Sequence, residues 1–435
     1  MRTRSSVSGR PLHSSPTHAR RTGDVAPESS RPRFRDYLIA APVAGAGTVN
    51  LWKLESLRSF VPVDLTLATM APVGGLVLLV LVVSPQRLRS VFPMLILVAS
   101  FLPGLALSSL NQPYAIQKCL QLFIFVPVLV AGGLLLVDDP RRQRAFRHTL
   151  IALGIAIAVG IEFGGTVVAE GSERVGLEDG NTIALARLCA LAVVSLLVSA
   201  PLKRPRLPAL LASALCLHAI FMTGSRGPLI AGLLGIAVAV VLAAPVGPGS
   251  DVREWERRLL TRVLPLAAGI AVGWTLIQHS RLITAFGGES DEVRVQLLGE
   301  SLRLWLANPL GLGWGDFVLH MELGLRNDLQ GWAQYPHNIL AEALVEGGPV
   351  ALLGLLYLSW LALRGLWKAA QDGNPPMLAL FVTTYGSALT SSDLTSNRAL
   401  WVLLGVGLAA FASHHDQQES TDLHHNRRVR IAMHQ

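Results

Sequence analysis

One long polar stretch separates two strongly apolar parts of the chain: residues 279–337, HSRLITAFGGESDEVRVQLLGESLRLWLANPLGLGWGDFVLHMELGLRNDLQGWAQYPH. The apolar runs on both sides approach the roughly 20 residues that a membrane-spanning helix needs. The stretch ends in Tyr335-Pro336-His337-Asn338, at the entry to the next apolar run. The sequence therefore predicts a helical membrane protein in which this segment is the long loop outside the bilayer.

The composition also places the chain in a bilayer. Of its 435 residues, 51% are hydrophobic and only 15% are charged, which leaves too little polar surface to coat a soluble protein of this size. A net charge of +8 could indicate nucleic-acid binding, but cytoplasmic loops of membrane proteins also collect Lys and Arg. Because the charges lie in the gaps between apolar runs, we expect membrane lipids as partners and no nucleic acid.

Twelve apolar runs predict an all-α, polytopic fold, although the first run is weak and ten or eleven helices are also possible. We expect a disordered, basic cytoplasmic tail at residues 1–36, a membrane domain at 37–413 and a second cytoplasmic tail at 414–435. The predicted helices are 37–53, 64–84, 91–108, 115–136, 147–164, 181–201, 207–224, 227–245, 262–278, 338–363, 376–391 and 398–413.

Basic residues set the predicted orientation. If the N-terminus is cytoplasmic, Lys and Arg fall in every cytoplasmic turn, as the positive-inside rule requires. Both tails are then cytoplasmic, and the 279–337 loop lies on the opposite face. Within this loop, residues 293–307 have apolar side chains at helical spacing, which predicts an amphipathic helix at the interface. Trp314, Trp332 and Tyr335 suit the headgroup level.

Two outward-facing residues suggest chemistry. Arg226 lies in a tight turn between two apolar runs, just before Pro228, which we expect to begin a helix whose free N–H groups attract an anion. A snorkelling Arg is the alternative, but the positive-inside rule makes an outer Arg unexpected. His337 precedes Asn338, a good N-cap residue. A lone interfacial His is more often a polar anchor than a catalyst.

The other outer charged residues favour a functional role for His337. Arginine forks match phosphate oxygens in pairs, so that several outer arginines near a neutral imidazole suggest a phosphate ester with a proton to be moved. Glu342 and Glu346 follow on one helical stripe, where they either pair with the intramembrane charges Lys118 or Arg187, or help to hold the site. Other outer candidates are Arg281, Arg294, Arg303 and Arg326, with Asp393, Asn397 and Arg398 in the last outer turn.

Three motifs in this order resemble the O-antigen ligase and polymerase superfamily of bacterial membrane enzymes. They are Ser225-Arg226-Gly227 opening a span, Arg294 followed by an amphipathic helix and Pro309-Leu310-Gly311-Leu312-Gly313, and Pro336-His337-Asn338 followed by Glu346-Gly347. Each motif is weak by itself, whereas the order and the shared outer face are more specific. The likeness covers roughly residues 181–363 by motif, and the whole chain by helix layout.

The resemblance implies roles for the matching residues. Arg226 and Arg294 would hold the diphosphate of an undecaprenyl diphosphate-linked glycan donor, His337 would be the general base, and Asn338 and Glu346 would support it. Arg174 and Asn181 resemble the shorter outer loop of the family more loosely, and Arg174 would also bind the diphosphate. Pro349, which should kink the last long helix, is a departure from the pattern.

The implied activity is that of a metal-independent, inverting glycosyltransferase in the bacterial inner membrane, acting at its periplasmic face on a glycan, lipid A core or protein acceptor. The sequence contains no DxD pair or phosphate-binding Gly loop, and its three cysteines have no metal-ligand spacing, so that we expect no cofactor or metal. Ligase and polymerase remain open. A polyprenyl-linked glycan flippase and a non-enzymatic scaffold are alternatives of other classes.

Overall fold

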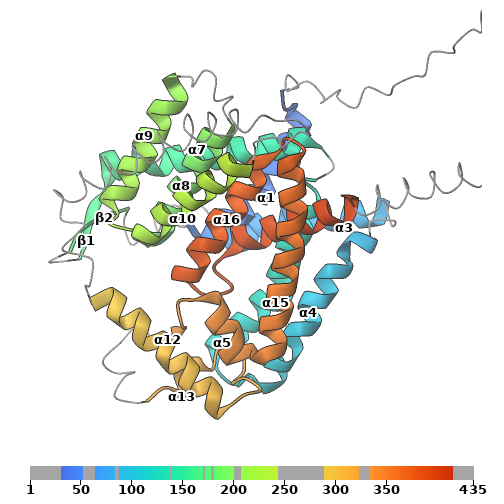
Figure 1. The fold of residues 1–435 in the computed structure, drawn as a ribbon, viewed down its shortest axis with the longest axis vertical. Coiled ribbons are helices and arrows are strands. Elements are labelled where there is room, and N and C mark those ends of the chain that lie inside the picture. Colours follow the sequence, from blue (N-terminus) through green and yellow to red (C-terminus); the bar gives the residue numbers. More distant parts are fainter. Residues whose placement is uncertain are drawn as a thin grey trace, which may run out of the picture. The chain divides into compact units, whose positions relative to one another are not determined.

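A computed structural model describes residues 31–51, 64–83, 88–137, 139–169, 172–177, 181–199, 207–242, 289–322 and 334–414 of the chain. Pro32–Gln435 form one compact unit. Within the described residues the fold is almost entirely helical, as the apolar runs predict (Figure 1).

The described helices coincide with eleven of the twelve predicted ones, and the predicted helix 262–278 lies outside the described residues. Four helices are long and apolar enough to cross a membrane, and five shorter ones are also apolar, so that a membrane protein is supported while twelve crossings stay a prediction. The first half contains α1 (Phe34–Thr48), η1 (Val49–Leu51), α3 (Leu65–Val83), α4 (Leu88–Leu107), α5 (Pro113–Leu120), the π-helical turn η3 (Gln121–Phe125), α6 (Val126–Leu134), α7 (Pro140–Gly164), β1 (Thr166–Ala169) and β2 (Ser172–Gly176). The second half contains α8 (Thr182–Ser199), α9 (Leu207–Met222), α10 (Arg226–Leu242), α12 (Glu289–Ala307), α13 (Phe317–His320), α15 (Ile339–Gln371), α16 (Pro375–Thr390) and a last helix, Arg398–His414.

Local sequence explains several boundaries. α7 begins seven residues before its predicted start because Asp139 caps it, accepting a hydrogen bond from the Arg141 N–H at 2.8 Å, and Pro140 occupies its first turn. α10 begins at Arg226, one residue before the start of the predicted helix 227–245. Part of the predicted outer loop after α7 is an antiparallel hairpin of β1 and β2, which alternation alone did not reveal in so short a segment.

The bundle has two polar ends. At one end, Tyr37 contacts His148 at 2.7 Å, and Asn374 donates to Gln143 at 2.6 Å. At the other end, Asn50 donates to the Ser396 carbonyl. Segments that the charge pattern predicts on the same side of the membrane thus lie at the same end of the bundle. Which end faces the cytoplasm stays a prediction.

The long helix α15 is two helices in succession. Its 33 residues would measure about 50 Å as a straight helix, far more than the roughly 30 Å of a hydrocarbon core. Gly348 interrupts it with φ 75° and ψ −177°, a conformation open in practice only to glycine, and a Cβ there would lie 2.3 Å from the Leu310 carbonyl oxygen. The break was expected at Pro349, which instead begins the second helix. We call residues 339–347 the entry segment.

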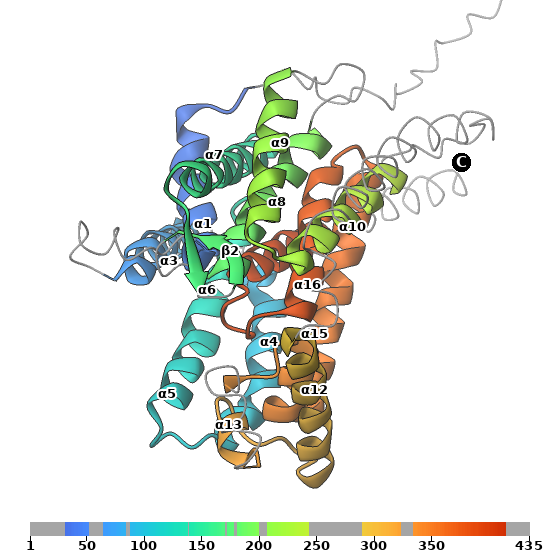
Figure 2. The ribbon, with the colours of Figure 1, turned by 90° about the vertical axis from the view of Figure 1, so that its left-hand side faces the viewer.

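α12 lies beside the entry segment's end of the bundle, and Figures 1 and 2 show it next to α13 and the lower part of α15. Its inner face is buried through Leu297 and Leu304. An apolar stripe on the opposite face is exposed, at 70% for Val295, 48% for Leu298, 52% for Leu302 and 67% for Leu306. The predicted amphipathic helix is therefore present, but Leu297 and Leu298 belong to opposite faces.

We expect this stripe to lie in lipid. In proteoliposomes, a bimane label at Leu298→Cys or Leu302→Cys should be quenched strongly by nitroxide-labelled lipids, because these positions would sit below the headgroups. The native cysteines of the described helices are buried and should label little. Gln296→Cys, about 160° from Leu298 and about 120° from Leu302 around the helix, is the matched control. Equal quenching at Gln296 and Leu302 would show that α12 does not rest on the membrane by this stripe.

Candidate active site

The end of α16 and the turn after it, residues 387–397, join several distant elements, and we call them the hub. Arg187 of α8, which is buried, donates from Nη2 to the backbone oxygens of Ser387 at 2.8 Å and Ser391 at 2.6 Å. Its Nη1 donates to Ser392 Oγ and Asn397 Oδ1, each at 3.0 Å. A cation bound to the last carbonyls of a helix satisfies them and complements the helix dipole. Arg187 therefore fixes the hub.

The entry segment begins on the hub. Asn338 caps it by accepting from the N–H groups of Leu340 at 2.9 Å and Ala341 at 3.1 Å, as its sequence position predicts. The other side of the same amide donates to the Leu389 carbonyl at 2.9 Å. This bond also holds His337, the residue before Asn338, close to the hub. Asn338 is thus a direct link between the two helices.

His337 is buried and packs on Tyr335, with ring centroids 4.4 Å apart. Burial raises the pKa of Tyr335 to about 12, and the negative charges of Asp393 and Glu342 add to the effect. The phenol is therefore neutral at physiological pH. The expectation that Tyr335 lies at the headgroup level stays a prediction.

Arg226 and Arg294 approach the same region from two other helices. Gly227, the residue after Arg226, lies so close to Thr390 that a Cβ on it would be 2.8 Å from the Thr390 hydroxyl. Arg226 thus begins α10 at the end of α16. Arg294 lies on α12, close enough to Arg187 for the two positive charges to repel each other, whereas the carboxylate of Asp393 attracts the Arg187 guanidinium. Both predicted arginines are therefore near the hub.

Backbone strain is concentrated in the same place. Within the described residues, two residues other than glycine have positive φ: His337 at 57° and Ser392 at 66°. This left-handed conformation is uncommon outside glycine and persists only where the surroundings impose it. Strained residues of this kind gather at active sites and ligand clamps. The strain favours a functional interpretation of the hub, since one of the two is the predicted base.

A buried ionic cluster lies beneath His337. Lys118 Nζ of α5 lies 2.6 Å from Glu342 Oε1 and 2.5 Å from Glu346 Oε2, and the three side chains are at most 1% exposed. Glu342 Oε2 also accepts from the Leu394 N–H at 2.8 Å, and Glu346 Oε2 accepts from the Gly315 N–H at 3.0 Å. Of the two partners considered for the carboxylates, Lys118 or Arg187, the structure selects Lys118.

The Pro-Leu-Gly-x-Gly motif forms a loop that docks on the entry segment. The N–H groups of Leu312 and Gly313 donate to the carbonyls of Val345 and Glu346, each at 2.9 Å. Trp314 follows and is fully buried, with Nε1 donating to the Phe101 carbonyl at 2.9 Å. The expectation that Trp314 lies at the headgroup level is therefore wrong, because this loop folds inward against α4.

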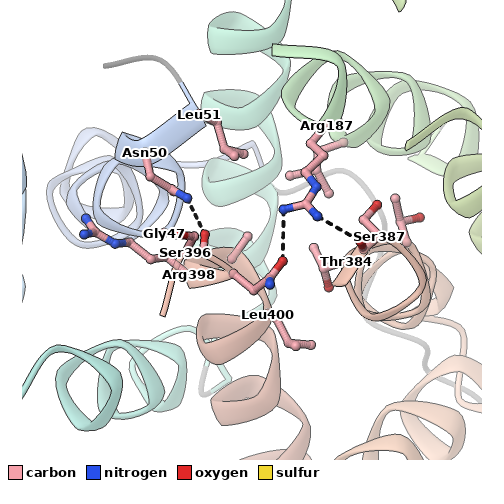
Figure 3. Close-up of a pocket in the computed structure, with 13 residues that line it drawn as sticks. Gly47, Asn50, Leu51, Arg187, Thr384, Ser387, Ser396, Arg398 and Leu400 are labelled. Carbon is pink, nitrogen blue, oxygen red and sulfur yellow. Dashed lines mark hydrogen bonds between the residues drawn. The ribbon is translucent and has the colours of Figure 1, made fainter. Parts of the chain in front are cut away.

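A small cavity adjoins the hub (Figure 3). Arg187, Ser387, Asn50 and Ser396 contribute to its lining, and the guanidinium of Arg398 points away from Arg187. Its volume is about 20 Å³, room for about one water molecule. This cavity is too small for a diphosphate.

Other predicted residues are less informative. Arg174 lies on β2, in the hairpin that precedes α8, but its side chain is outside the described part of the structure, as are Arg281, Arg326 and Trp332. Arg303 is bound to Glu300 Oε1 and Oε2 at 2.6 and 2.7 Å on α12. Lys118 and Arg187 were recognisable as single charges in apolar helices, but their roles at the site were not predicted.

Comparison with known proteins agrees with the motifs. The family model described as O-antigen ligase matches residues 211–356. This range includes Arg226, Arg294 and His337, and it leaves out Lys118 and Arg187. The match confirms the resemblance to the O-antigen ligase and polymerase superfamily. No curated protein matches the chain.

Proposed function

We propose that this chain, of which residues 211–356 match the family model described as O-antigen ligase, moves a glycan from undecaprenyl diphosphate to an acceptor hydroxyl. The reaction would occur at the periplasmic face of the bacterial inner membrane, with both termini cytoplasmic. One observation carries the proposal: the segments bearing Arg226 and His337 both contact the end of α16. Arg294 lies within electrostatic range of Arg187, which binds the same end.

The chemistry needs two kinds of group. The acceptor oxygen attacks the anomeric carbon, and the bond from that carbon to the lipid diphosphate breaks with its electron pair on the diphosphate. Arg226 and Arg294 would stabilise this growing negative charge, which makes them more valuable in the transition state than in the ground state. His337 would take the hydroxyl proton, a contribution of about 10² to 10⁴ in rate.

Transfer by purified protein tests the reaction. The protein in proteoliposomes is given an undecaprenyl diphosphate-linked oligosaccharide, with and without lipid A core. A product on lipid A core would identify a ligase, and elongation of the lipid-linked oligosaccharide itself would identify a polymerase. Movement of the donor across the bilayer with no new glycosidic bond would overturn the proposal and indicate a flippase.

We predict that the transferred glycan changes its anomeric configuration, because a single displacement inverts the reacting carbon. Nuclear magnetic resonance of the donor and the purified product would show the two configurations directly. Retention would exclude the one-step mechanism and require a covalent glycosyl-enzyme intermediate. The linkages inside the transferred oligosaccharide, which take no part in the reaction, serve as the internal control.

A further inference from the structure

The entry segment, which carries His337 at its start, cannot hold its own position. It has nine residues, about two and a half turns of helix. The helix is interrupted at Gly348, so that the rest of α15 does not extend the entry segment. The placement of the imidazole therefore depends on bonds from the entry segment to other elements.

Those bonds lead to three elements. At its start, Asn338 is bonded to the hub. In its middle, Glu342 accepts from the Leu394 N–H of the same hub. At its end, Glu346 accepts from the Gly315 N–H in the loop after α12. The third element is α5, which reaches both carboxylates through one ammonium group.

We propose that Lys118 is a positioning residue for His337, acting by tying the two carboxylates of the entry segment to α5. This inference rests on the proposed function for its catalytic consequence. Lys118 lies outside residues 211–356 and so outside the family match. Its ammonium bridges Glu342 and Glu346, one helical turn apart, and through them joins the hub to the loop at Gly315.

The surroundings of Lys118 hold it firmly. Its Nζ lies 5.6 Å from the centroid of the Tyr114 ring, a cation–π contact in a buried site. The π-helical turn Gln121–Phe125 follows immediately, and such turns often occur at functional sites in helices. Gly315, bonded to Glu346, also packs on Ala115, because a Cβ on Gly315 would lie 2.7 Å from the Ala115 Cα. The ammonium is therefore fixed against the same loop that it organises.

Stability alone does not account for this arrangement. A buried ion pair recovers little more than its own desolvation cost, and apolar residues of similar volume in its place are often as stable. A cluster of this kind does, however, specify geometry. Small displacements of a catalytic group can reduce turnover by about 10²-fold, which is the effect expected when the tie to α5 is lost.

The test uses a variant designed to fold. Lys118→Met alone would leave two carboxylates uncompensated, so Lys118→Met is combined with Glu342→Gln and Glu346→Gln, whose amide oxygens can still accept from Leu394 and Gly315. We expect the melting temperature and the KM for the lipid-linked donor to stay close to those of the parent, and kcat to fall about 10²-fold. Lys368→Met, which removes an exposed ion pair with Asp372, is the control and should retain full kcat.

Hydrogen exchange gives a readout that does not depend on the reaction. In the triple variant, the amides of residues 339–347 should exchange faster, while those of the last helix, Arg398–His414, stay unchanged. Parent-like kcat in the folded triple variant would overturn the positioning role and leave the proposed function standing. If the parent transfers no glycan, the proposed function fails, and exchange alone decides: unchanged protection of residues 339–347 would overturn the role of Lys118.

Discussion

His337→Ala should abolish glycan transfer while leaving donor binding close to normal. The imidazole is the predicted acceptor of the hydroxyl proton, and removing a general base lowers the rate by about 10² to 10⁴. The donor should still bind, since its diphosphate is assigned to arginines on α10 and α12. Single-turnover transfer measures the rate, and binding of undecaprenyl diphosphate to the same preparation measures the site.

Two controls separate chemistry from backbone strain. His337 has φ 57°, a conformation that Asn adopts more readily than most residues. His337→Asn should therefore keep the local fold and still lose transfer. His320, on α13 and bonded to the Asp316 carbonyl at 3.0 Å, is the matched control, and His320→Ala should remain active. Full activity of the His337→Asn variant would remove the imidazole from the mechanism.

Much of the fold could be predicted because hydropathy reports it directly. Each predicted helix in the described part of the chain corresponds to a helix of the structure, and the start of α7 moved to its N-cap, Asp139. The break inside α15 was predicted less well. Gly347-Gly348-Pro349 was interpreted as a proline kink, whereas the break comes from the backbone of Gly348. A glycine's φ depends on what packs against it, here the Leu310 carbonyl.

The site was harder to predict than the fold. Arg226, Arg294 and His337 were suggested by residue type and by order along the chain, but nothing in their spacing indicates that the end of α16 links them. Lys118 and Arg187 were each evident as a charge in an apolar helix. Their partners lie 200 or more residues away in sequence, so that only the folded chain pairs them.

The position of Trp314 could not be predicted from the sequence either. A tryptophan in a polar loop next to apolar helices suits the membrane interface. In the structure, two glycines make room for it inside the protein: a Cβ on Gly104 would lie 2.5 Å from Trp314 Nε1, and a Cβ on Gly347 would lie 2.4 Å from its ring. This complementarity joins α4 to the end of the entry segment, and no local pattern encodes it.

Arg226→Ala should weaken both donor binding and transfer. A hydrogen bond to a charged group contributes about 1.5 to 3 kcal/mol, so that kcat/KM for the donor should fall by roughly 10 to 100-fold. Arg226→Lys should recover part of the loss, because an ammonium keeps the charge but not the paired donors of a guanidinium. Initial rates over a range of donor concentrations would measure all three proteins.

Inhibition by two lipids that differ in one phosphate group tests more directly whether Arg226 contacts the diphosphate. If Arg226 contacts the diphosphate, Arg226→Ala should raise the inhibition constant of undecaprenyl diphosphate more than that of undecaprenyl monophosphate, which lacks one phosphate group. Arg303→Ala, at an exposed arginine already bound to Glu300 on α12, should change neither constant. An equal rise for both lipids would show that Arg226 does not contact the terminal phosphate, because only a contact with that phosphate distinguishes the two inhibitors.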